Sequence, residues 1–353
     1  YTEMDYLRIF CAILAFLLII FILIFPDVAT LGAKNAVEMW LNIVIPCLMP
    51  YCAASTMLVK SGVLQRLSRP LNGATRKLTG FSGCFSYVFI TSLLSGYPNG
   101  ARLCGELYSS GSISAKEASR MINATSLCGP SFIICAVSSG MLNNISLFKY
   151  IIVGHYLSSL IIALINGKTA KFSALELSKT NKEKDNSAWD IIASSVEIAA
   201  FAMLKILGFM VVLCVFGSLV ANIFSDFLIN GSAINALFYG IIEMTNGCKA
   251  ASTLEIPTAL VIISFIVSFG GLSVICQTVS AAKEYNLKTS GLIPSKIVQG
   301  IISASITFLY LHFFPPTVSA FSIQQSTYTI SIIPVIVAVI CSITVLIAKR
   351  NRN

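Results

Sequence analysis

The segment Ser95-Gly96-Tyr97-Pro98-Asn99-Gly100-Ala101-Arg102-Leu103 places two glycines, a proline, an amide and a cation inside an apolar region. The runs 87–94 and 131–142 on either side are hydrophobic enough to lie at membrane depth. In hydrocarbon, irregular backbone is tolerated only where protein or a water-filled cavity surrounds it, because unpaired backbone groups are costly there. The segment therefore predicts a helix that is broken within a membrane, which is typical of a transport site.

A second segment repeats this pattern further along the chain. Met244-Thr245-Asn246-Gly247-Cys248-Lys249 has the same order of asparagine, glycine, small residue and cation. The triplets Gly129-Pro130-Ser131 and Gly271-Leu272-Ser273 form another matching pair, each inside an apolar run. We therefore expect two halves, each with one interrupted hairpin and one interrupted crossing helix.

The composition fits this interpretation. Of the 353 residues, 56% are hydrophobic and 11% are charged, and the mean hydropathy is +0.83. Soluble domains have about a quarter of their residues charged. The net charge of +9 would also suit a nucleic-acid-binding protein, but the cations fall in short loops between apolar runs, where the positive-inside rule explains them. The chain is thus predicted to be an integral membrane protein with several spans, the first at 9–25.

Positive charges predict the orientation, because short cytoplasmic loops are enriched in lysine and arginine. Five cations lie between 60 and 77, and others lie in the segment 167–190 and at 349–352. Lys283, Lys288 and Lys296 follow the fourth interruption and are assigned to the inner side as well. Both termini are therefore expected to be cytoplasmic, with the first hairpin opening inward and the second outward.

This pattern predicts an all-α integral membrane protein with an inverted-repeat, transporter-like fold that contains re-entrant hairpins and discontinuous helices. The first repeat is expected to open with a helix at 37–59, kinked by Pro46 and Pro50. The predicted parts are a transmembrane helix and outer loop (1–36), the first repeat (37–166, hairpin 83–108), a cytoplasmic loop (167–190), the second, inverted repeat (191–314, hairpin 234–254), and an outer loop, last transmembrane helix and basic C-terminus (315–353).

The helix starts at the breaks carry the predicted chemistry. A helix that begins inside a membrane has unpartnered amides and presents about half a positive charge, so it favours an anion. Each Asn-Gly break also supplies a side-chain amide and a cation. Two such sites facing each other would suit a small dicarboxylate. The predicted substrate-binding residues are Ser95, Asn99, Gly100, Arg102, Asn123, Ser126, Ser131, Asn246, Gly247, Lys249, Ser273 and Gln277.

Structural alternatives stand beside these assignments. Arg102 could lie at the membrane surface and Lys249 could extend its ammonium group towards water. The serines and Gln277 could simply hold helices together, as small polar residues do in membranes. Glu243 could pair with Lys249, carry a proton that couples transport, or neutralise the empty site. Lys205 could reach the cavity or extend to the membrane surface.

Other kinds of chemistry find little support in the sequence. His155 and His312 lack neighbours for a metal site or a catalytic triad. The eleven cysteines form no Cys-x-x-Cys pair and are interpreted as small buried hydrophobes. Because no phosphate-binding loop of the Walker type is present, we expect no ATP-driven mechanism. We expect no enzyme activity, cofactor or nucleic-acid partner. An H⁺ or Na⁺ gradient is one candidate energy source, and the sequence leaves open the coupling ion, a passive mode and the oligomeric state.

Several motifs together resemble a known family. Ser95-Gly96-Tyr97-Pro98-Asn99-Gly100-Ala101-Arg102, the segment 123–132, His155-Tyr156 and the segment 268–273 are similar to the YlbJ-like sporulation integral membrane proteins, also called stage V sporulation protein V. The resemblance runs from about residue 25 to about residue 314 and is most specific in the Ser-Gly-[Tyr/Phe]-Pro-x-Gly-Ala-[Lys/Arg] run. The family belongs to the nucleoside-recognition (GATE) group of transporter-like membrane proteins.

The resemblance implies a role in endospore formation. The expected function is secondary transport of dipicolinic acid, pyridine-2,6-dicarboxylate, across the mother-cell-derived outer forespore membrane of an endospore-forming bacterium. Two alternatives remain open. One is transport of a nucleoside or nucleobase, as the name of the GATE group suggests, and the other is a non-transporting sporulation scaffold that uses the loop 167–190. The resemblance assigns no substrate contacts, so the binding residues above rest on the sequence pattern alone.

Overall fold

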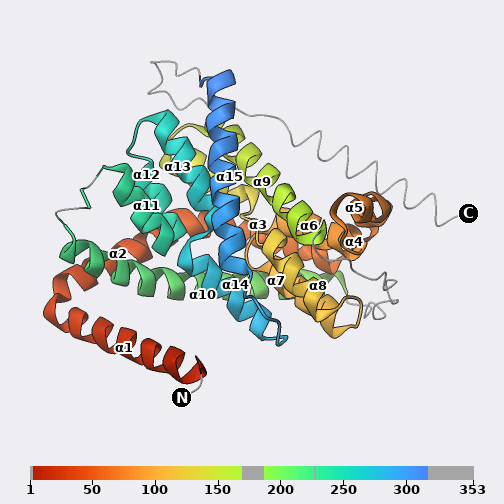
Figure 1. Ribbon diagram of the computed structural model, residues 1–353, viewed down its shortest axis with the longest axis horizontal. Helices are drawn as coiled ribbons and strands as arrows, with labels where there is room; N and C mark the ends of the chain where they lie inside the picture. Colours follow the sequence, from red (N-terminus) through yellow and green to blue (C-terminus); the bar gives the residue numbers. More distant parts are fainter. Residues whose placement is uncertain (1–2, 169–186, 226–227, 230, 317–353) are drawn as a thin grey trace, which may run out of the picture. The chain divides into compact units, whose positions relative to one another are not determined.

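The computed structural model describes residues 3–168, 187–225, 228–229 and 231–316. Within these residues all regular secondary structure is helical (Figure 1), which confirms the predicted all-α class. The described helices belong to one compact unit, Tyr1–Pro315. The predicted last transmembrane helix, its outer loop, the basic C-terminus and most of the loop 167–190 lie outside the described residues.

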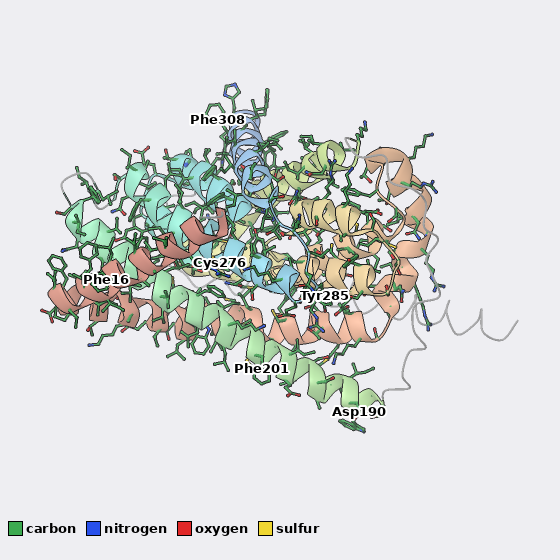
Figure 2. The ribbon with its side chains drawn as sticks, turned by 60° about the horizontal axis from the view of Figure 1, so that its bottom comes forward. Phe16, Asp190, Phe201, Cys276, Tyr285 and Phe308 are labelled. Carbon is green, nitrogen blue, oxygen red and sulfur yellow. The ribbon has the colours of Figure 1, made fainter. Side chains whose placement is uncertain are left out.

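Five helical segments in the described part of the chain are long and apolar enough to cross a membrane, and a bent pair, Val63–Thr79 with Cys84–Ser95, could form a sixth. Helix α1 (Glu3–Ile24) covers all but the last residue of the predicted first span, although its apolar stretch Ala12–Ile24 is shorter than the five. Large apolar side chains such as Phe16, Phe201 and Phe308 point outward (Figure 2), each about 60% exposed or slightly more. Such surfaces suit contact with lipid. The five spans are Pro26–Lys60, Ile145–Lys168, Ala188–Ile223, Ile256–Lys283 and Leu292–Phe313.

The first of these spans begins earlier than predicted. Helix α2 (Pro26–Met39) continues through the π-helical turn η1 (Trp40–Val44) into α3 (Ile45–Lys60), whereas the sequence predicted a helix at 37–59. Pro26 lies at the first helical position, where its missing N–H is no loss. The chain then forms α4 (Val63–Ser68), the 3₁₀ turn η2 (Arg69–Leu71) and α5 (Asn72–Thr79).

Two pairs of short helices lie at the positions where the sequence predicted interrupted hairpins, 83–108 and 234–254. Helices α6 (Cys84–Ser95) and α7 (Asn99–Ser109) are joined by residues 96–98, which we call the first break. Helices α11 (Ala233–Ile242) and α12 (Met244–Ala251) are joined by Glu243 alone, which we call the third break.

The predicted position of the third break is wrong. The sequence placed it at 245–247, but Asn246 and Gly247 lie in the first turn of α12. The reason is local: Glu243 has extended backbone (φ −142°, ψ 121°), and its side chain accepts a hydrogen bond from the Asn246 N–H. Glu243 is therefore the N-cap of α12, and the helix begins at the next residue, Met244.

Two longer helices are interrupted as well. Between α8 (Ala115–Thr125) and the π-helix η3 (Phe132–Met141), residues 126–129 are not helical and form the second break. Between α13 (Ile256–Phe269) and α14 (Gly271–Lys283), Gly270 with φ 89° forms the fourth break. Glycine suits this position because residues with a side chain rarely adopt such a conformation.

The remaining helices surround the interrupted ones. The 3₁₀ turn η4 (Ile145–Leu147) leads into α9 (Phe148–Lys168). Helix α10 (Ala188–Ile223) packs along α2 and α3. Helix α15 (Leu292–Phe313) packs against both α9 and α13 (Figure 1). Three points stay predictions: the inversion of the two halves, the side of the membrane that each loop faces, and the limits of the predicted parts.

Candidate substrate cavity

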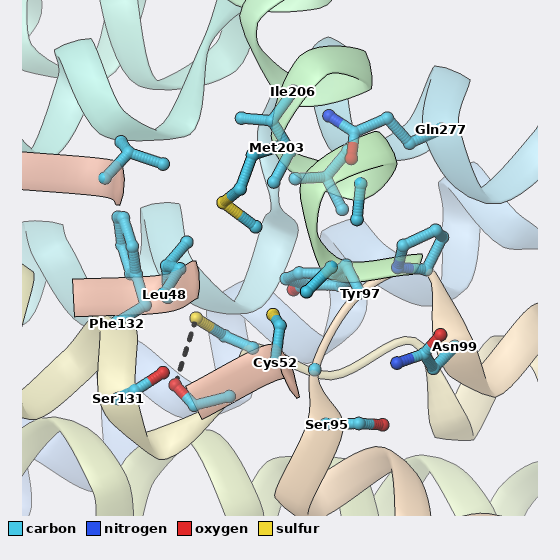
Figure 3. A pocket seen from close by; sticks show the side chains of 18 of the residues that line it. Leu48, Cys52, Ser95, Tyr97, Asn99, Ser131, Phe132, Met203, Ile206 and Gln277 are labelled. Carbon is cyan, nitrogen blue, oxygen red and sulfur yellow. Dashed lines mark hydrogen bonds between the residues drawn. The ribbon is translucent and has the colours of Figure 1, made fainter. Parts of the chain in front are cut away.

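All four breaks contribute to the lining of one cavity, either directly or through the residues beside them. The cavity holds about 840 Å³ of space not filled by atoms, which includes its open mouth. Its wall contains Tyr97 of the first break, Gly129 of the second, Glu243 of the third and Ser273, which follows the fourth. Apolar side chains from α3, α10 and η3 complete it, among them Leu48, Met203, Ile206 and Phe132 (Figure 3).

The breaks approach each other in pairs. A Cβ atom on Gly96 would lie 2.9 Å from the backbone nitrogen of Gly129, so the first and second breaks are in contact. A Cβ atom on Gly271 would lie 2.9 Å from the carbonyl oxygen of Gly240, and 3.0 Å from the nitrogen of Met244, which brings the fourth break against the third. Glycine permits this close approach of two backbones. Segments far apart in the sequence therefore meet at the cavity.

Side chains provide hydrogen-bond partners for the non-helical backbone of the second break. The Cys128 N–H donates to His155 Nε2 at 3.0 Å, and the Tyr156 hydroxyl donates to the Cys128 carbonyl at 3.2 Å. Because Nε2 accepts a hydrogen bond, the proton of the neutral ring is on Nδ1, which donates to Ser268 Oγ at 2.9 Å. His155 is thus a structural partner of the break. This arrangement meets the requirement that irregular backbone inside a membrane protein finds internal partners.

Glu243 occupies the N-terminus of α12. Its side chain is 3% exposed, and its Oε2 accepts from the Asn246 N–H at 2.7 Å. Thr245 and Ser273 interact with the same carboxylate. The positive end of this helix is therefore already matched by an acidic group of the chain itself. Lys249, further along the same helix, is exposed and does not line this cavity.

The N-terminus of α7 differs, because no side chain caps it. The amides of Asn99 and Gln277 line the cavity and make no hydrogen bond to a described residue. The Ser131 hydroxyl, also in the lining, is buried without a hydrogen-bond partner in the described structure. The Ser95 hydroxyl, by contrast, donates to the Thr91 carbonyl at 2.7 Å. The cavity thus offers free polar groups near the start of α7.

A second cavity adjoins the first. It holds about 1020 Å³ of unfilled space and shares Pro98, Asn99, Ile198, Ala202 and Gln277 with the first cavity. Its lining includes both Arg102 and Lys205.

The charges of the second cavity are paired. Arg102 Nε lies 3.0 Å from Glu106 Oε1, with the two side chains 45% and 44% exposed. Lys205 Nζ lies 3.8 Å from Glu284 Oε1. Burial, and then the charge of Glu106, raise the pKa of Tyr285, so this phenol in the lining remains neutral at neutral pH.

The two predicted cationic sites are therefore not brought together in the first cavity. Arg102 lines only the second cavity, Lys249 lines neither, and no lysine or arginine among the described residues lines the first. The binding roles of Arg102 and Lys249 stay predictions.

The other predicted site residues divide clearly between lining and support. Ser95, Asn99, Ser131, Ser273, Gln277 and Glu243 line the first cavity. Five further residues line neither cavity, and several serve the packing: Asn123 Nδ2 donates to Asn166 Oδ1 at 3.2 Å, and Ser126 Oγ donates to the Ile122 carbonyl at 2.8 Å. These five are Gly100, Asn123, Ser126, Asn246 and Gly247.

The predicted place of Lys296 is wrong. The sequence assigned it to an inner loop, but it lies in α15 and is 1% exposed. Its Nζ donates to the Ser126 carbonyl and to Gln299 Oε1, both at 2.8 Å, and lies 3.5 Å from the Tyr97 hydroxyl. The signal that could have found it was its place one turn inside an apolar run of span length.

These features define an all-helical integral membrane protein whose interrupted helices converge on a cavity with a largely apolar wall and a few polar groups. No family model matches the chain. The chain is 25% identical over 317 residues to "Sporulation integral membrane protein YlbJ" of Bacillus subtilis (strain 168), covering 80% of this chain and 78% of that protein. This match confirms the resemblance to the YlbJ-like sporulation membrane proteins.

A solved structure of a CNTnw variant in the intermediate 2 state aligns with 86% of this chain and 85% of its own at 13% identity and a TM-score of 0.45. A similarity at this level supports no inference about the present chain.

Proposed function

We propose that this chain transports a small, planar, polar solute across a membrane, and that the solute binds in the first cavity. The observation that carries the proposal is the convergence of four interrupted helices on one cavity. Breaks at membrane depth are expensive to build and are tolerated where they line a substrate pathway. The breaks leave backbone polar groups that a continuous helix would pair internally, and they carry polar side chains beside them.

Dipicolinate during sporulation is the leading substrate candidate, with the outer forespore membrane as the proposed location. The resemblance to the sporulation family suggests it, and the lining supports it. Tyr97 and Phe132 offer aromatic faces for a planar ring. The side-chain amides of Asn99 and Gln277, beside the start of α7, offer donors for carboxylate oxygens.

A nucleoside or nucleobase is the second candidate, and the charge of the lining favours it. Among the described residues, the first cavity is lined by the carboxylate of Glu243 and by no cation. An uncharged ring needs no cation, and an amide side chain such as Asn99 or Gln277 can both donate and accept, as the polar edge of a nucleobase requires. The scaffold alternative depends on a loop that lies mostly outside the described residues.

Uptake into proteoliposomes that contain only this chain tests the proposal. The vesicles are offered labelled dipicolinate, uridine or uracil in separate assays, and we expect saturable uptake of dipicolinate. Uptake of uridine or uracil in place of dipicolinate would show that the substrate is a nucleoside or nucleobase, the second candidate. If none of the three enters vesicles that carry correctly folded protein, the transport proposal is wrong for these substrates.

Variants of the lining locate the site. Asn99→Ala and Gln277→Ala should each raise KM about tenfold, because one hydrogen bond to the substrate contributes roughly 1 to 1.5 kcal/mol. Asn35→Ala, an exposed asparagine on α2, is the matched control and should leave KM unchanged. Equal KM values for all three variants and the unmodified chain would place the binding site elsewhere.

A further inference from the structure

Lys296 is a buried cation with no acidic partner among the described residues. It is 1% exposed and forms no salt bridge with any of them. An unpaired charge inside a membrane protein is costly and usually serves a function. A merely structural contact could be made by a neutral side chain at lower cost.

Three oxygen atoms from three parts of the chain surround its ammonium group. The Ser126 carbonyl belongs to the second break, Gln299 Oε1 to α15, and the Tyr97 hydroxyl to the first break. An ammonium group has three N–H donors, one for each of these oxygens. Tyr97 also lines the first cavity, so the ammonium group lies directly behind the proposed substrate site.

No other charged group in the described part of the chain compensates the ammonium. The titratable groups that interact with it are Tyr97 of the first break, Cys128 of the second break and His155 of α9. The hydrogen bonds of His155 show a neutral ring. The two lysines of α9, Lys149 and Lys168, are exposed near its ends. Helix α13, which packs against α15, contains no titratable residue.

The charged side chains of α8, which also packs against α15, are engaged elsewhere or exposed. Glu117 accepts from the Ser82 N–H at 2.7 Å, Arg120 donates to the Asn166 carbonyl at 3.1 Å, and Lys116 is exposed.

We infer that Lys296 binds and releases the proton that couples transport to a pH gradient. The inference rests on the proposed transport function and adds its energy source. With its proton, the amine can donate to all three oxygens. Without it, only two N–H donors remain, so one of the three contacts is lost as a donated hydrogen bond. Losing a proton therefore weakens the hydrogen bonding that holds α15 to the first and second breaks, both of which contribute to the cavity.

The test separates transport from coupling. Proteoliposomes are assayed first for exchange of a labelled substrate at equal pH on both sides, and then for net uptake under a pH gradient of either direction. A gradient of one pH unit can sustain about tenfold accumulation when one proton accompanies each substrate. We expect the unmodified chain to show exchange and, under one gradient direction, this accumulation.

Two variants identify the residue. Lys296→Arg keeps a positive charge and its donors but cannot release a proton at ordinary pH; it should retain exchange and lose gradient-driven accumulation. Lys296→Met has similar length and no charge, and should show the same pattern. Lys288→Arg, exposed in the turn before α15, is the control and should behave like the unmodified chain. Because Lys296→Arg preserves the charge, it tests the inference even where Lys296→Met fails to fold.

The outcomes are distinct. If the unmodified chain shows no exchange of any offered substrate, the proposed function fails and the coupling inference fails with it. If it exchanges substrate but does not respond to a pH gradient, only the coupling inference is overturned. Gradient-driven accumulation by Lys296→Arg equal to that of the unmodified chain would also overturn it, while leaving the transport function intact.

Discussion

At the scale of single residues, buried polar side chains hold together parts of the chain that are distant in the sequence. His155 lies in the largely apolar helix α9, yet it joins the Cys128 backbone to Ser268, 27 and 113 positions away in the sequence. Glu243 similarly ends one helix and starts the next by accepting from the Asn246 N–H. Both side chains substitute for backbone partners that the breaks remove. Their roles are therefore linked to the interrupted helices themselves.

Replacing His155 should destabilise the protein. His155→Phe keeps an aromatic ring of similar shape but leaves the Cys128 N–H without a partner, which costs roughly 1 to 3 kcal/mol. We expect a lower melting temperature in detergent. The control is His312→Phe, because His312 is exposed near the end of α15. Equal melting temperatures for the two variants would contradict the role assigned to His155.

At the scale of structural elements, glycines determine how closely the breaks approach. Gly96 has φ 71°, and a Cβ atom there would lie 2.9 Å from the Gly129 nitrogen. Gly111, in the turn after α7, has a similar φ of 73°, but a Cβ atom there would meet nothing within 4 Å. The two positions share a positive φ, but Gly96 also has a ψ of −168°, which essentially only glycine adopts, and of the two only Gly96 is crowded.

This difference gives a matched pair of variants. Gly111→Ala should cost about 1 to 2 kcal/mol of stability, the usual penalty for a side chain in the left-handed region. Gly96→Ala should cost clearly more, because it also pushes the first break away from the second, and it should abolish substrate exchange. Thermal unfolding in detergent and the exchange assay measure both effects. A Gly96→Ala protein as stable and active as Gly111→Ala would show that the contact between breaks is unimportant.

At the scale of the whole molecule, the predicted inversion of the two halves concerns the sides of the membrane. The exposed residues Ser109, at the end of α7, and Thr253, just after α12, mark the open ends of the two helix pairs. If the halves are inverted, these ends face opposite sides. The distribution of cations predicts that the end of α7 faces the cytoplasm.

Cysteine labelling of intact cells tests this topology. In a background without native cysteines, Thr253→Cys should react with a membrane-impermeant maleimide added outside, and Ser109→Cys should react only after the membrane is opened. The two variants serve as controls for each other. Labelling of both from the same side would exclude an inverted repeat.

The class of the protein and the approximate positions of its interruptions could be predicted from the sequence alone. Hydropathy and the positions of glycine and proline are local properties, and they predicted the all-helical membrane protein, the first break and the interruptions near Gly129 and Gly270. The third break was predicted a few residues late, because the helix start depends on the side chain of Glu243.

Which groups meet at the cavity depends on long-range packing and could not be predicted from the sequence. Lys296 and Ser126 are 170 positions apart in the sequence, yet their atoms lie 2.8 Å from each other. The pairing of Lys205 with Glu284 likewise depends on how α10 and α14 pack. The environment of a charge is set by long-range packing, whereas the tendency to enter or interrupt a membrane helix is set by the residue and its immediate neighbours.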